Sequence, residues 1–409
     1  MFGSDIRDYQ LNSVLTQCRG GVAVVYTASH RPSGLTVAIK RFYLDRAKES
    51  ATLIQQEILT TRQLQHPNIL PYFSTFVNGL DLYIVCNLMS YGSCRDLINK
   101  YFNEGLPELA SCIVLRDTLQ GLDYIHKKGY IHRGIRSSHI LVSSAGEVCL
   151  SGLRSAGSLL LQGKRQKALH CLPPPCHNNS ALIWLSPELL EQNLSGYDEK
   201  SDIYSVGMVA CELANGAIPF SDIPTTLMLT EKVRGHTPQL LDSTTFSHIN
   251  FQDDPEVHGD HPLTHSNSFP LPESSSSSSL IPPEQLALYH PSIPHNLLQK
   301  LNQNVDAGVG DSVAGGSAQH MRQVYATRRL TESFHEFTEM CLQREPEMRP
   351  TPSQLLHHSF FKQIRKSDSL PQMLQPAQLI EDRTDNLPAS LLEDQISEMA
   401  LDASCEWDF

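Results

Sequence analysis

Apolar and polar side chains alternate with a period of two in the first part of the chain, which is typical of β-strands. The alternation predicts strand structure over residues 13–30 and 35–43, separated by the turn signal Pro32-Ser33-Gly34. A helix is expected over about 47–64, and another apolar strand over 81–88. The N-terminal part of the chain is therefore expected to be rich in strands.

The period changes to three or four residues after position 107. Leu115, Leu119 and Leu122 recur at this spacing and predict an amphipathic helix. Further helices are expected at 204–214 and 333–342. Strands followed by helices predict an α+β fold, with a small β-rich lobe joined to a larger helical lobe.

Two regions lack this periodicity. Residues 243–329 contain the serine run 274–279 and several prolines and glycines, so they are expected to form a disordered insert in the helical lobe. The sequence after 364 is also weakly patterned. The expected organisation is an N-terminal tail at 1–8, a folded domain at 9–364 with a small lobe at 9–89 and a large lobe at 90–364, and a flexible C-terminal tail at 365–409.

Length and charge narrow the function classes. The chain has 409 residues, enough for one bilobal domain with tails, and its 32 Lys+Arg against 44 Asp+Glu give a net charge of −12. So acidic a chain is a poor candidate for general binding to nucleic acid or to anionic membranes. No apolar run approaches the ~20 residues that span a bilayer, and residues 1–8 have no apolar signal core. We expect no nucleic-acid partner, no membrane association and no secretion.

The ten cysteines are scattered, mostly among apolar neighbours, as expected of reduced intracellular thiols. One cluster, His170-Cys171 with Cys176-His177, has metal-binding residue types. The proline run at 173–175 hinders the convergence of these four side chains on one tetrahedral zinc ion. An exposed loop is therefore expected there, and no metal site.

Lys40 ends the apolar strand Val37-Ala38-Ile39, and Glu57 follows seventeen residues later on the expected helix. This spacing suits a strand lysine that contacts nucleotide phosphates and is held by a helix glutamate. Taken alone, Lys40 would be interpreted as a solvated surface lysine. The motifs that follow it along the chain favour the other interpretation.

Four motifs follow in the order found in protein kinases: His132-Arg133 after an amphipathic helix, Ser186-Pro187-Glu188, Asp202 and Arg349-Pro350. Such an ordered set predicts the protein-kinase fold. Glu188 and Arg349 are expected to form a buried ion pair, and Asp202 to accept backbone N–H bonds near the catalytic loop. Both roles are structural.

The positions at which phosphoryl transfer would occur carry the wrong side chains. Counting from His132, the catalytic aspartate is replaced by Gly134 and the metal-binding asparagine by His139, which we interpret as a packed loop histidine. The Asp-Phe-Gly motif becomes Gly152-Leu153-Arg154. A positioned base alone is worth ~10²–10⁴-fold in rate, so the sequence predicts a pseudokinase with no catalytic residues.

Nucleotide binding is a separate question. Our hypothesis is that Lys40, Arg136 and Arg154 neutralise a triphosphate directly, so that ATP binds as a structural ligand without Mg²⁺. The alternative is a collapsed, empty pocket whose arginines pair with acidic neighbours. The other candidate nucleotide-binding residues are Gln17, Cys18 and Gly20 of a glycine-rich loop that keeps one of the motif's three glycines, Val25, Ala38 and Leu141 around an adenine ring, Asn87 and Met89 of the hinge, and Glu57.

Several segments together resemble the STRAD family, the sterile-twenty-related kinase adaptors, which are pseudokinases. They are residues 138–141, Gly152-Leu153-Arg154 in place of Asp-Phe-Gly, residues 184–188 and 201–207, and the terminal Trp407-Asp408-Phe409. The resemblance covers about residues 9–364 and reappears at the C-terminus. Lys40 and the sequence of residues 305–312 favour the beta paralogue.

The resemblance implies an adaptor. It would activate the tumour-suppressor serine/threonine kinase upstream of the AMP-activated kinase in a heterotrimer with a calcium-binding protein 39 type scaffold, and retain that kinase in the cytoplasm; cytoplasm and nucleus are the expected locations. The activation segment, with Lys164 and Arg165, would dock on the kinase. Trp407 and Phe409 would fill an apolar pocket on the scaffold, where Asp408 replaces the family's glutamate.

Two other function classes stay open. One is a residual or unconventional ATP-dependent kinase, supported by Lys40, Glu57 and the fold. The other is an interaction module that binds no nucleotide and acts in stress or survival signalling.

Overall fold

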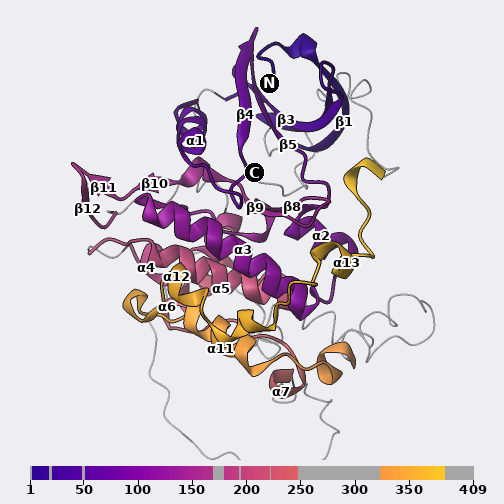
Figure 1. Cartoon of the computed structure of the whole chain (residues 1–409). Coiled ribbons are helices and arrows are strands. Elements are labelled where there is room, and N and C mark those ends of the chain that lie inside the picture. The colour runs from indigo at the N-terminus through magenta and orange to yellow at the C-terminus, as the bar shows by residue number, and fades with distance from the viewer. Residues whose placement is uncertain are drawn as a thin grey trace, which may run out of the picture.

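The computed structural model describes residues 2–17, 21–47, 51–168, 179–192, 195–221, 223–246 and 323–382. Two lobes are stacked, a β-rich lobe above and a helical lobe below (Figure 1). This is the expected α+β arrangement of the protein-kinase fold. Within the described residues, no helix is both long and apolar enough to cross a membrane.

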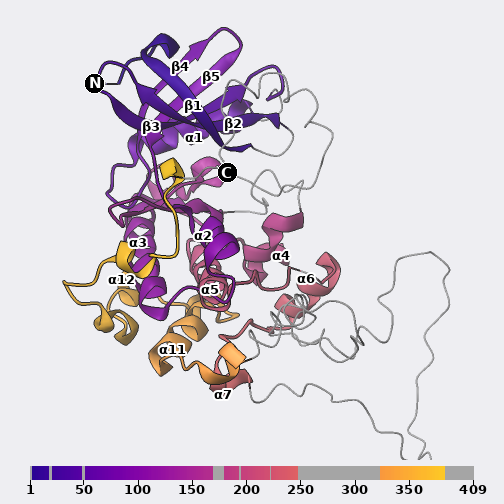
Figure 2. The same ribbon diagram turned by 90° about the vertical axis from the view of Figure 1, so that its right-hand side faces the viewer.

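The small lobe is an antiparallel five-stranded sheet, in the order β1-β2-β3-β5-β4, with helix α1 against it (Figures 1 and 2). Every β2 residue except Ser29 is buried, whereas β1 is mostly half-buried. The elements are β1 (Tyr9–Gln17), β2 (Ala23–His30), β3 (Leu35–Tyr43), α1 (Ala51–Gln63), β4 (Tyr72–Asn78) and β5 (Asp81–Asn87).

The sheet register places the cleft-facing residues side by side. Lys40 of β3 is opposite Val25 of β2 on one side and Ile84 of β5 on the other. Ala38 is opposite Cys86. Residues two apart in a strand share a face, so Ala38 and Lys40 point to the same side, toward the cleft.

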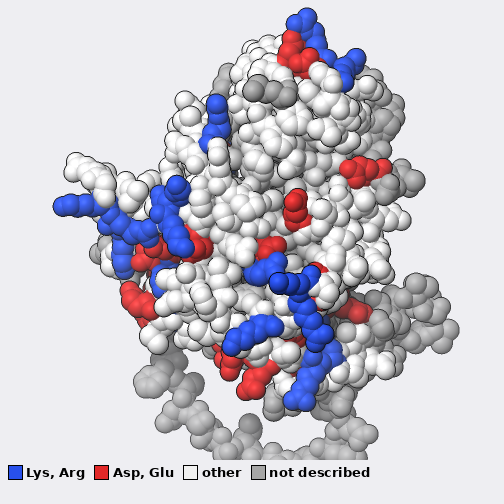
Figure 3. Space-filling model, in the orientation of Figure 1, with Lys and Arg blue, Asp and Glu red and all other residues white. Residues whose placement is uncertain are grey.

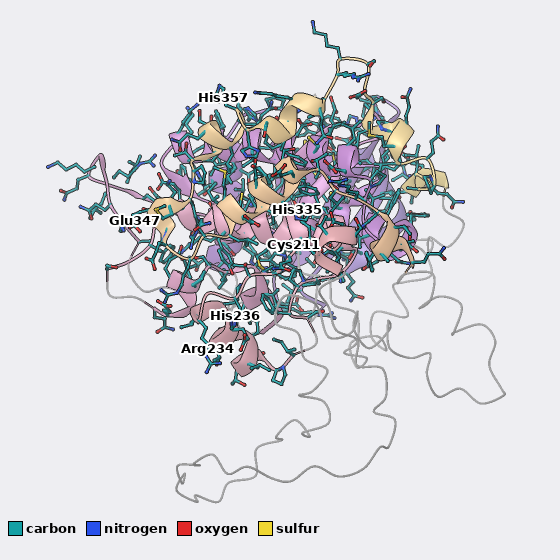
Figure 4. The ribbon with its side chains drawn as sticks, turned by 90° about the horizontal axis from the view of Figure 1, so that it is seen from below. Cys211, Arg234, His236, His335, Glu347 and His357 are labelled. Atoms are coloured by element: carbon teal, nitrogen blue, oxygen red, sulfur yellow. The ribbon has the colours of Figure 1, made fainter. Side chains whose placement is uncertain are left out.

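The helical lobe is built around α5, which is buried from Ser201 to Asn215. Helix α11 packs on α5, and His335 of α11 contacts Asp242 at 3.0 Å between Nε2 and Oδ2. Figure 4 shows the lobe from below, with Cys211 and His335 near its middle and Arg234 and His236 at its rim. The helices are α2 (Cys94–Tyr101), α3 (Glu108–Lys127), α4 (Pro187–Leu190), α5 (Lys200–Asn215), α6 (Thr225–Val233), α7 (Ser243–Phe246), α11 (Glu332–Cys341), α12 (Pro352–Leu355) and α13 (Leu370–Met373).

Short strand pairs at the cleft side of this lobe carry the catalytic loop and the activation segment. Strand β8 pairs with β6 and β9, β7 pairs with β10, and β11 pairs with β12. The strands are β6 (Gly92–Ser93), β7 (Tyr130–Ile131), β8 (Ile140–Val142), β9 (Val148–Leu150), β10 (Gly157–Ser158), β11 (Leu160–Leu161) and β12 (Lys164–Arg165).

The elements expected from the periodicity are present, with shifted ends. The region 13–30 is two strands, and the helices expected at 47–64, 204–214 and 333–342 are α1, α5 and α11. Strand β4 and helix α2 were not expected; β4 is a half-buried strand with little alternation. The helix expected after 107 is α3.

Two expected boundaries need correction. The sequence predicts a disordered insert over 243–329, but residues 243–246 form α7, and Tyr325 is fully buried with its hydroxyl donating to the carbonyl of Asn215 at 2.7 Å. Residues 365–382 were assigned to the flexible tail, but they include α13 and the buried side chains of Leu370 and Leu374. The expectations for residues 247–322, the 170–177 cluster, Cys18, Gly20 and the terminal Trp407-Asp408-Phe409 lie outside the described residues.

Candidate functional site

A cavity of about 420 Å³ lies between the lobes. Of the expected nucleotide-binding residues, it brings together Gln17, Val25, Ala38, Lys40, Glu57, Asn87, Met89 and Leu141. The residues that the sequence analysis did not assign to it are Leu15, Thr16, Leu70, Tyr72, Ile84, Cys86, Leu88, Gly92, Ser93, Asp96, Lys100, Ser151, Gly152 and Ile380. Thr16, Cys86, Leu88, Ser151 and Gly152 lie next to or within an assigned motif; the others, above all the distant Ile380, gave no such signal.

Lys40 and Glu57 form an ion pair at the inner part of the cavity. Lys40 Nζ lies 3.5 Å from Glu57 Oε1, and the same oxygen accepts a 2.6 Å hydrogen bond from the Tyr72 hydroxyl. Glu57 Oε2 is buried and has no hydrogen-bond partner among the described residues. Burial and the nearby Glu57 carboxylate raise the pKa of Tyr72, which keeps its hydroxyl a donor. Helix α1 is thereby tied to β3 and β4.

The outer part of the cavity is apolar and joins the lobes. Val25 and Ala38 of the small lobe pack in one cluster with Met89 of the hinge and Leu141 of the large lobe. The thiol of Cys86 lies 3.7 Å from the Ala38 carbonyl, and burial raises its pKa to about 12. An uncharged thiol among aliphatic walls suits a flat, apolar ring system better than an ion.

His139 is packed into the former catalytic loop as a neutral ring. Its Nδ1 donates to the Gly134 carbonyl at 2.6 Å, which leaves Nε2 to accept hydrogen bonds from Arg136 Nη2 at 2.9 Å and Nε at 3.2 Å. Burial, together with the Arg136 charge, lowers the pKa of His139 well below its ordinary value. The position of the metal-binding asparagine therefore holds a side chain already committed to protein groups.

Gly152 and His139 fit each other sterically. Gly152 has φ of +78°, and a Cβ built on it would lie 2.4 Å from His139 Nδ1. Any side chain at 152, including the aspartate that holds metal in kinases, would collide with the His139 ring in this arrangement. The two substitutions are thus compatible as a pair, and the ring occupies the space from which an aspartate would reach a cation.

Arg136 and Arg154 do not line the cavity. The Arg136 guanidinium bonds to His139, and Arg154 lies on the turn Leu153–Ser155 with its Nε buried and without a hydrogen-bond partner among the described residues. Of the three expected phosphate-binding cations, the structure brings only Lys40 to the cavity wall. Within the described residues, no group of His, Cys, Asp and Glu side chains is arranged to hold a metal ion.

Asp202 anchors the catalytic loop. Its carboxylate accepts 2.8 Å hydrogen bonds from the backbone N–H groups of His132 and Arg133 and lies 2.8 Å from His126 Nε2. Burial alone would raise the pKa of Asp202, but the contact with His126 and the nearby ring of His132 outweigh burial and lower it. The loop is therefore held in place although its catalytic aspartate is missing.

Glu188 and Arg349 form a buried ion pair through two parallel bonds. Arg349 Nη1 lies 2.7 Å from Glu188 Oε1, and Nη2 lies 2.8 Å from Oε2. Arg349 also donates to three backbone carbonyls, among them that of Lys200. The pair ties the end of the activation segment to the helical lobe.

The activation segment carries a projecting hairpin, β11–β12. Its turn residues Gln162 and Gly163 both have positive φ, 51° and 76°, as a type I′ turn requires. Leu161 is 59% exposed. Figure 3 shows basic side chains gathered on this projection.

The two expected partner-binding cations of this hairpin have different surroundings. Lys164 is exposed. Arg165 bonds to Glu199 and donates from Nη2 to the His126 carbonyl at 2.5 Å, so it holds the hairpin against the lobe. Only Lys164 has its charge directed to solvent without a described ion pair.

Comparison with known proteins identifies the family. Residues 18–361 match the family Protein kinase domain. STE20-related kinase adapter protein alpha of Mus musculus is 40% identical over 375 residues, which cover 90% of this chain and 76% of the mouse protein. The alpha protein of Bos taurus is 41% identical over 371 residues, covering 90% and 88% of the two chains.

The beta relatives are also similar. STE20-related kinase adapter protein beta of Mus musculus is 34% identical over 382 residues, 91% of this chain and 80% of the relative. The identities are higher for the alpha proteins, so they do not support the leaning toward the beta paralogue. The long matches, together with the kinase-type cleft, show that this chain belongs to the STRAD family, the STE20-related kinase adapter proteins.

Proposed function

We propose that the chain is a pseudokinase adaptor that binds a serine/threonine kinase and activates it allosterically. The observation that carries this proposal is the packing of the former catalytic centre. His139 fills the space beside Gly152 and bonds to Gly134 and Arg136, so the loop has no base and no open metal position. A kinase fold that lacks these groups cannot act through phosphoryl transfer, so it would act on a partner through binding at its surface. The names of its relatives, kinase adapter proteins, favour the same role.

The proposed ligand of the cavity is ATP, held as a structural ligand without Mg²⁺. Val25, Ala38 and Leu141 would enclose the adenine, and Lys40 would contact the phosphates. Arg136 and Arg154 would add positive potential from behind the wall, since neither lines the cavity. ATP would act by holding the two lobes in the closed arrangement, which presents the activation segment to the partner.

A thermal-shift titration with EDTA present tests ATP binding. For a site with a Kd of ~100 µM, 1 mM ATP should add about 1.4 kcal/mol to the free energy of unfolding. Lys40→Met should remove most of this gain, whereas Lys127→Met, on the exposed end of α3, should not. A wild-type chain that gains no stability at millimolar ATP would leave the interaction module without nucleotide as the better account.

The proposed partner is the tumour-suppressor serine/threonine kinase upstream of the AMP-activated kinase. The β11–β12 hairpin would dock on it, because Leu160 and Leu161 are exposed beside the free charge of Lys164. Exposed apolar side chains on a projecting, ordered hairpin are typical of a protein-binding surface. Retention of this kinase in the cytoplasm, and a location of the adaptor in cytoplasm and nucleus, belong to the same proposal.

Co-expression with the partner kinase tests the docking surface. Leu161→Asp should reduce capture of the kinase and its activity strongly, because a desolvated charge would enter the interface. Leu35→Asp is the matched control, since Leu35 is 56% exposed at the start of β3 in the other lobe. Equal capture by both variants would remove the hairpin from the interface.

The proposed third component is a scaffold of the calcium-binding protein 39 family, which would bind the terminal Trp407-Asp408-Phe409 to give a heterotrimer. Deletion of these three residues should abolish capture of the scaffold and leave the folded lobes unchanged. If both chains capture it equally, the terminal residues have no such role.

A second candidate function, residual kinase activity, is favoured only by the Lys40–Glu57 pair. Radiolabelled ATP with Mg²⁺ or Mn²⁺ and a generic substrate tests it. Phosphate transfer that Lys40→Met abolishes would replace the adaptor proposal by an enzymatic one.

A further inference from the structure

The chain after the kinase-like core turns back along the helical lobe toward the hinge. Leu370 and Leu374 are buried in the core of that lobe. The packing is close, since a Cβ on Gly146 would lie 2.5 Å from Pro371 Cδ. From α13 the segment rises to the level of the cleft, as both views of the ribbon show (Figures 1 and 2).

The segment then bonds to the chain just after the hinge. The backbone N–H of Ile380 donates to the Ser90 carbonyl at 2.7 Å, and the Ser90 hydroxyl donates to Glu381 Oε1 at 3.2 Å. Ile380 itself is only 5% exposed. A backbone bond, a side-chain bond and a buried apolar side chain thus fix the segment at one point.

That point is the cavity. Ile380 lines it together with Leu15 of β1 and Met89 of the hinge, although the whole large lobe separates it from both in sequence. An aliphatic side chain with its backbone tied to the hinge is suited to pack against the face or edge of an apolar ring. Nothing else from the segment after α13 lines the cavity in the described part of the chain.

We infer that residues 377–382 are a strap that forms one wall of the ligand cavity, with Ile380 as its contact residue. The strap is docked in the ligand-free chain, and a bound adenine nucleotide packs on Ile380. The identity of this ligand rests on the proposed function; the docking of the strap does not. Because ligand and strap share a contact, each must stabilise the other by the same free energy.

The test uses the full chain and two matched side-chain substitutions. Ile380→Ala removes the contact, and Leu379→Ala removes the same number of carbon atoms from the neighbouring, half-buried residue that does not line the cavity. Calorimetric titration with ATP and EDTA should give a Kd raised about three- to tenfold by Ile380→Ala, because part of a buried aliphatic contact is lost. Leu379→Ala should leave the Kd within about twofold of the wild-type value.

Hydrogen–deuterium exchange supplies the readout that does not need a ligand. The peptide spanning 376–382 should be protected in the free chain, exchange faster in Ile380→Ala, and exchange more slowly when ATP is added to the wild-type chain. An unprotected peptide overturns the strap, whether or not ATP binds.

The remaining outcomes separate the two proposals. If ATP binds the wild-type chain and Ile380→Ala equally, Ile380 is no wall of the site, and the inference fails while the proposed ligand stands. If the peptide is protected but ATP does not bind, the nucleotide proposal fails, and the docked strap is supported.

Discussion

His139 is the residue that most clearly separates this site from a catalytic one. Its ring is neutral in the folded chain because it is buried and because Arg136 donates to its Nε2, so that a proton there would lose an acceptor and face a cation. A histidine whose folded pKa is lowered stabilises the fold above its ordinary pKa and loses that contribution as the pH falls below it.

The pH dependence of stability should therefore change in His139→Asn. Because the pKa of His139 lies well below its ordinary value of 6.5, the free energy of unfolding of the wild-type chain should lose on the order of 1 kcal/mol through this residue between pH 7.5 and pH 5.5. The variant keeps a donor toward Gly134 but has no titrating group at this position. Between pH 7.5 and pH 5.5 its free energy of unfolding should therefore fall less than that of the wild-type chain, by the same amount. Urea unfolding at the two pH values measures the difference; parallel losses in the two proteins would mean that His139 is protonated without penalty.

Arg349 belongs to the same scale. Its removal in Arg349→Leu would leave Glu188 charged and buried without its partner, which should cost ~3–5 kcal/mol of the free energy of unfolding. Arg7→Leu is the control, since Arg7 and Asp5 form an exposed pair and the urea midpoint should stay in place. A similar midpoint shift in both variants would contradict the structural role of the buried pair.

At the scale of elements, the catalytic loop packs against the start of the activation segment at His139 and Gly152. Gly152→Asp should destabilise the fold by ~1–3 kcal/mol, because its Cβ collides with the His139 ring. The left-handed backbone adds little to this cost, since aspartate tolerates that conformation. His139→Asn in the same chain should recover much of the loss.

A double-mutant cycle measures this recovery. The wild-type chain, the two single variants and the double variant are unfolded in urea, and the interaction energy should be at least 0.5 kcal/mol in the compensating direction, as for residues in contact. Strictly additive losses would show that the two positions do not depend on each other.

The sequence predicts elements well where one periodicity governs a long segment. Helix α3 is such a segment, and an ordered set of motifs predicts the kinase-type site around Lys40. Periodicity gives no signal for β4, which is half-buried with little alternation. It also gives none for residues 323–329 and 365–382, whose few buried side chains are stabilised by surfaces far away in the sequence.

The same reason explains what the sequence analysis missed at the site. Arg136 and Arg154 stand at positions that suggest phosphate contact, yet the direction of a side chain depends on its tertiary neighbours, here His139 for Arg136. Periodicity and motifs do not assign Ile380 to the site, because the whole large lobe separates it in sequence from its neighbours Ser90 and Met89. Motifs predict where a residue lies in a known fold. They do not predict contacts made by a segment outside that fold, such as the one that carries Ile380.

At the scale of the whole molecule, two features join the lobes: the apolar cluster around Leu141 spans the cleft, and the strap at Ile380 borders it. Within the small lobe, the Lys40–Glu57 pair holds α1 against the sheet. Each favours the closed arrangement without chemistry on a phosphate. A partner that prefers the closed form binds with higher affinity when other contacts already hold the chain closed. A pseudokinase can influence a partner in this way through shape alone.

One reconstitution tests this central claim most directly. The purified chain and the scaffold are mixed with the partner kinase in its active form and, in parallel, with a catalytically inactive variant of that kinase, and phosphorylation of the partner's peptide substrate is measured. We predict that the chain raises the rate many-fold with the active kinase and gives no phosphorylation with the inactive one. Phosphorylation with the inactive kinase, or no increase with the active one, would contradict the account.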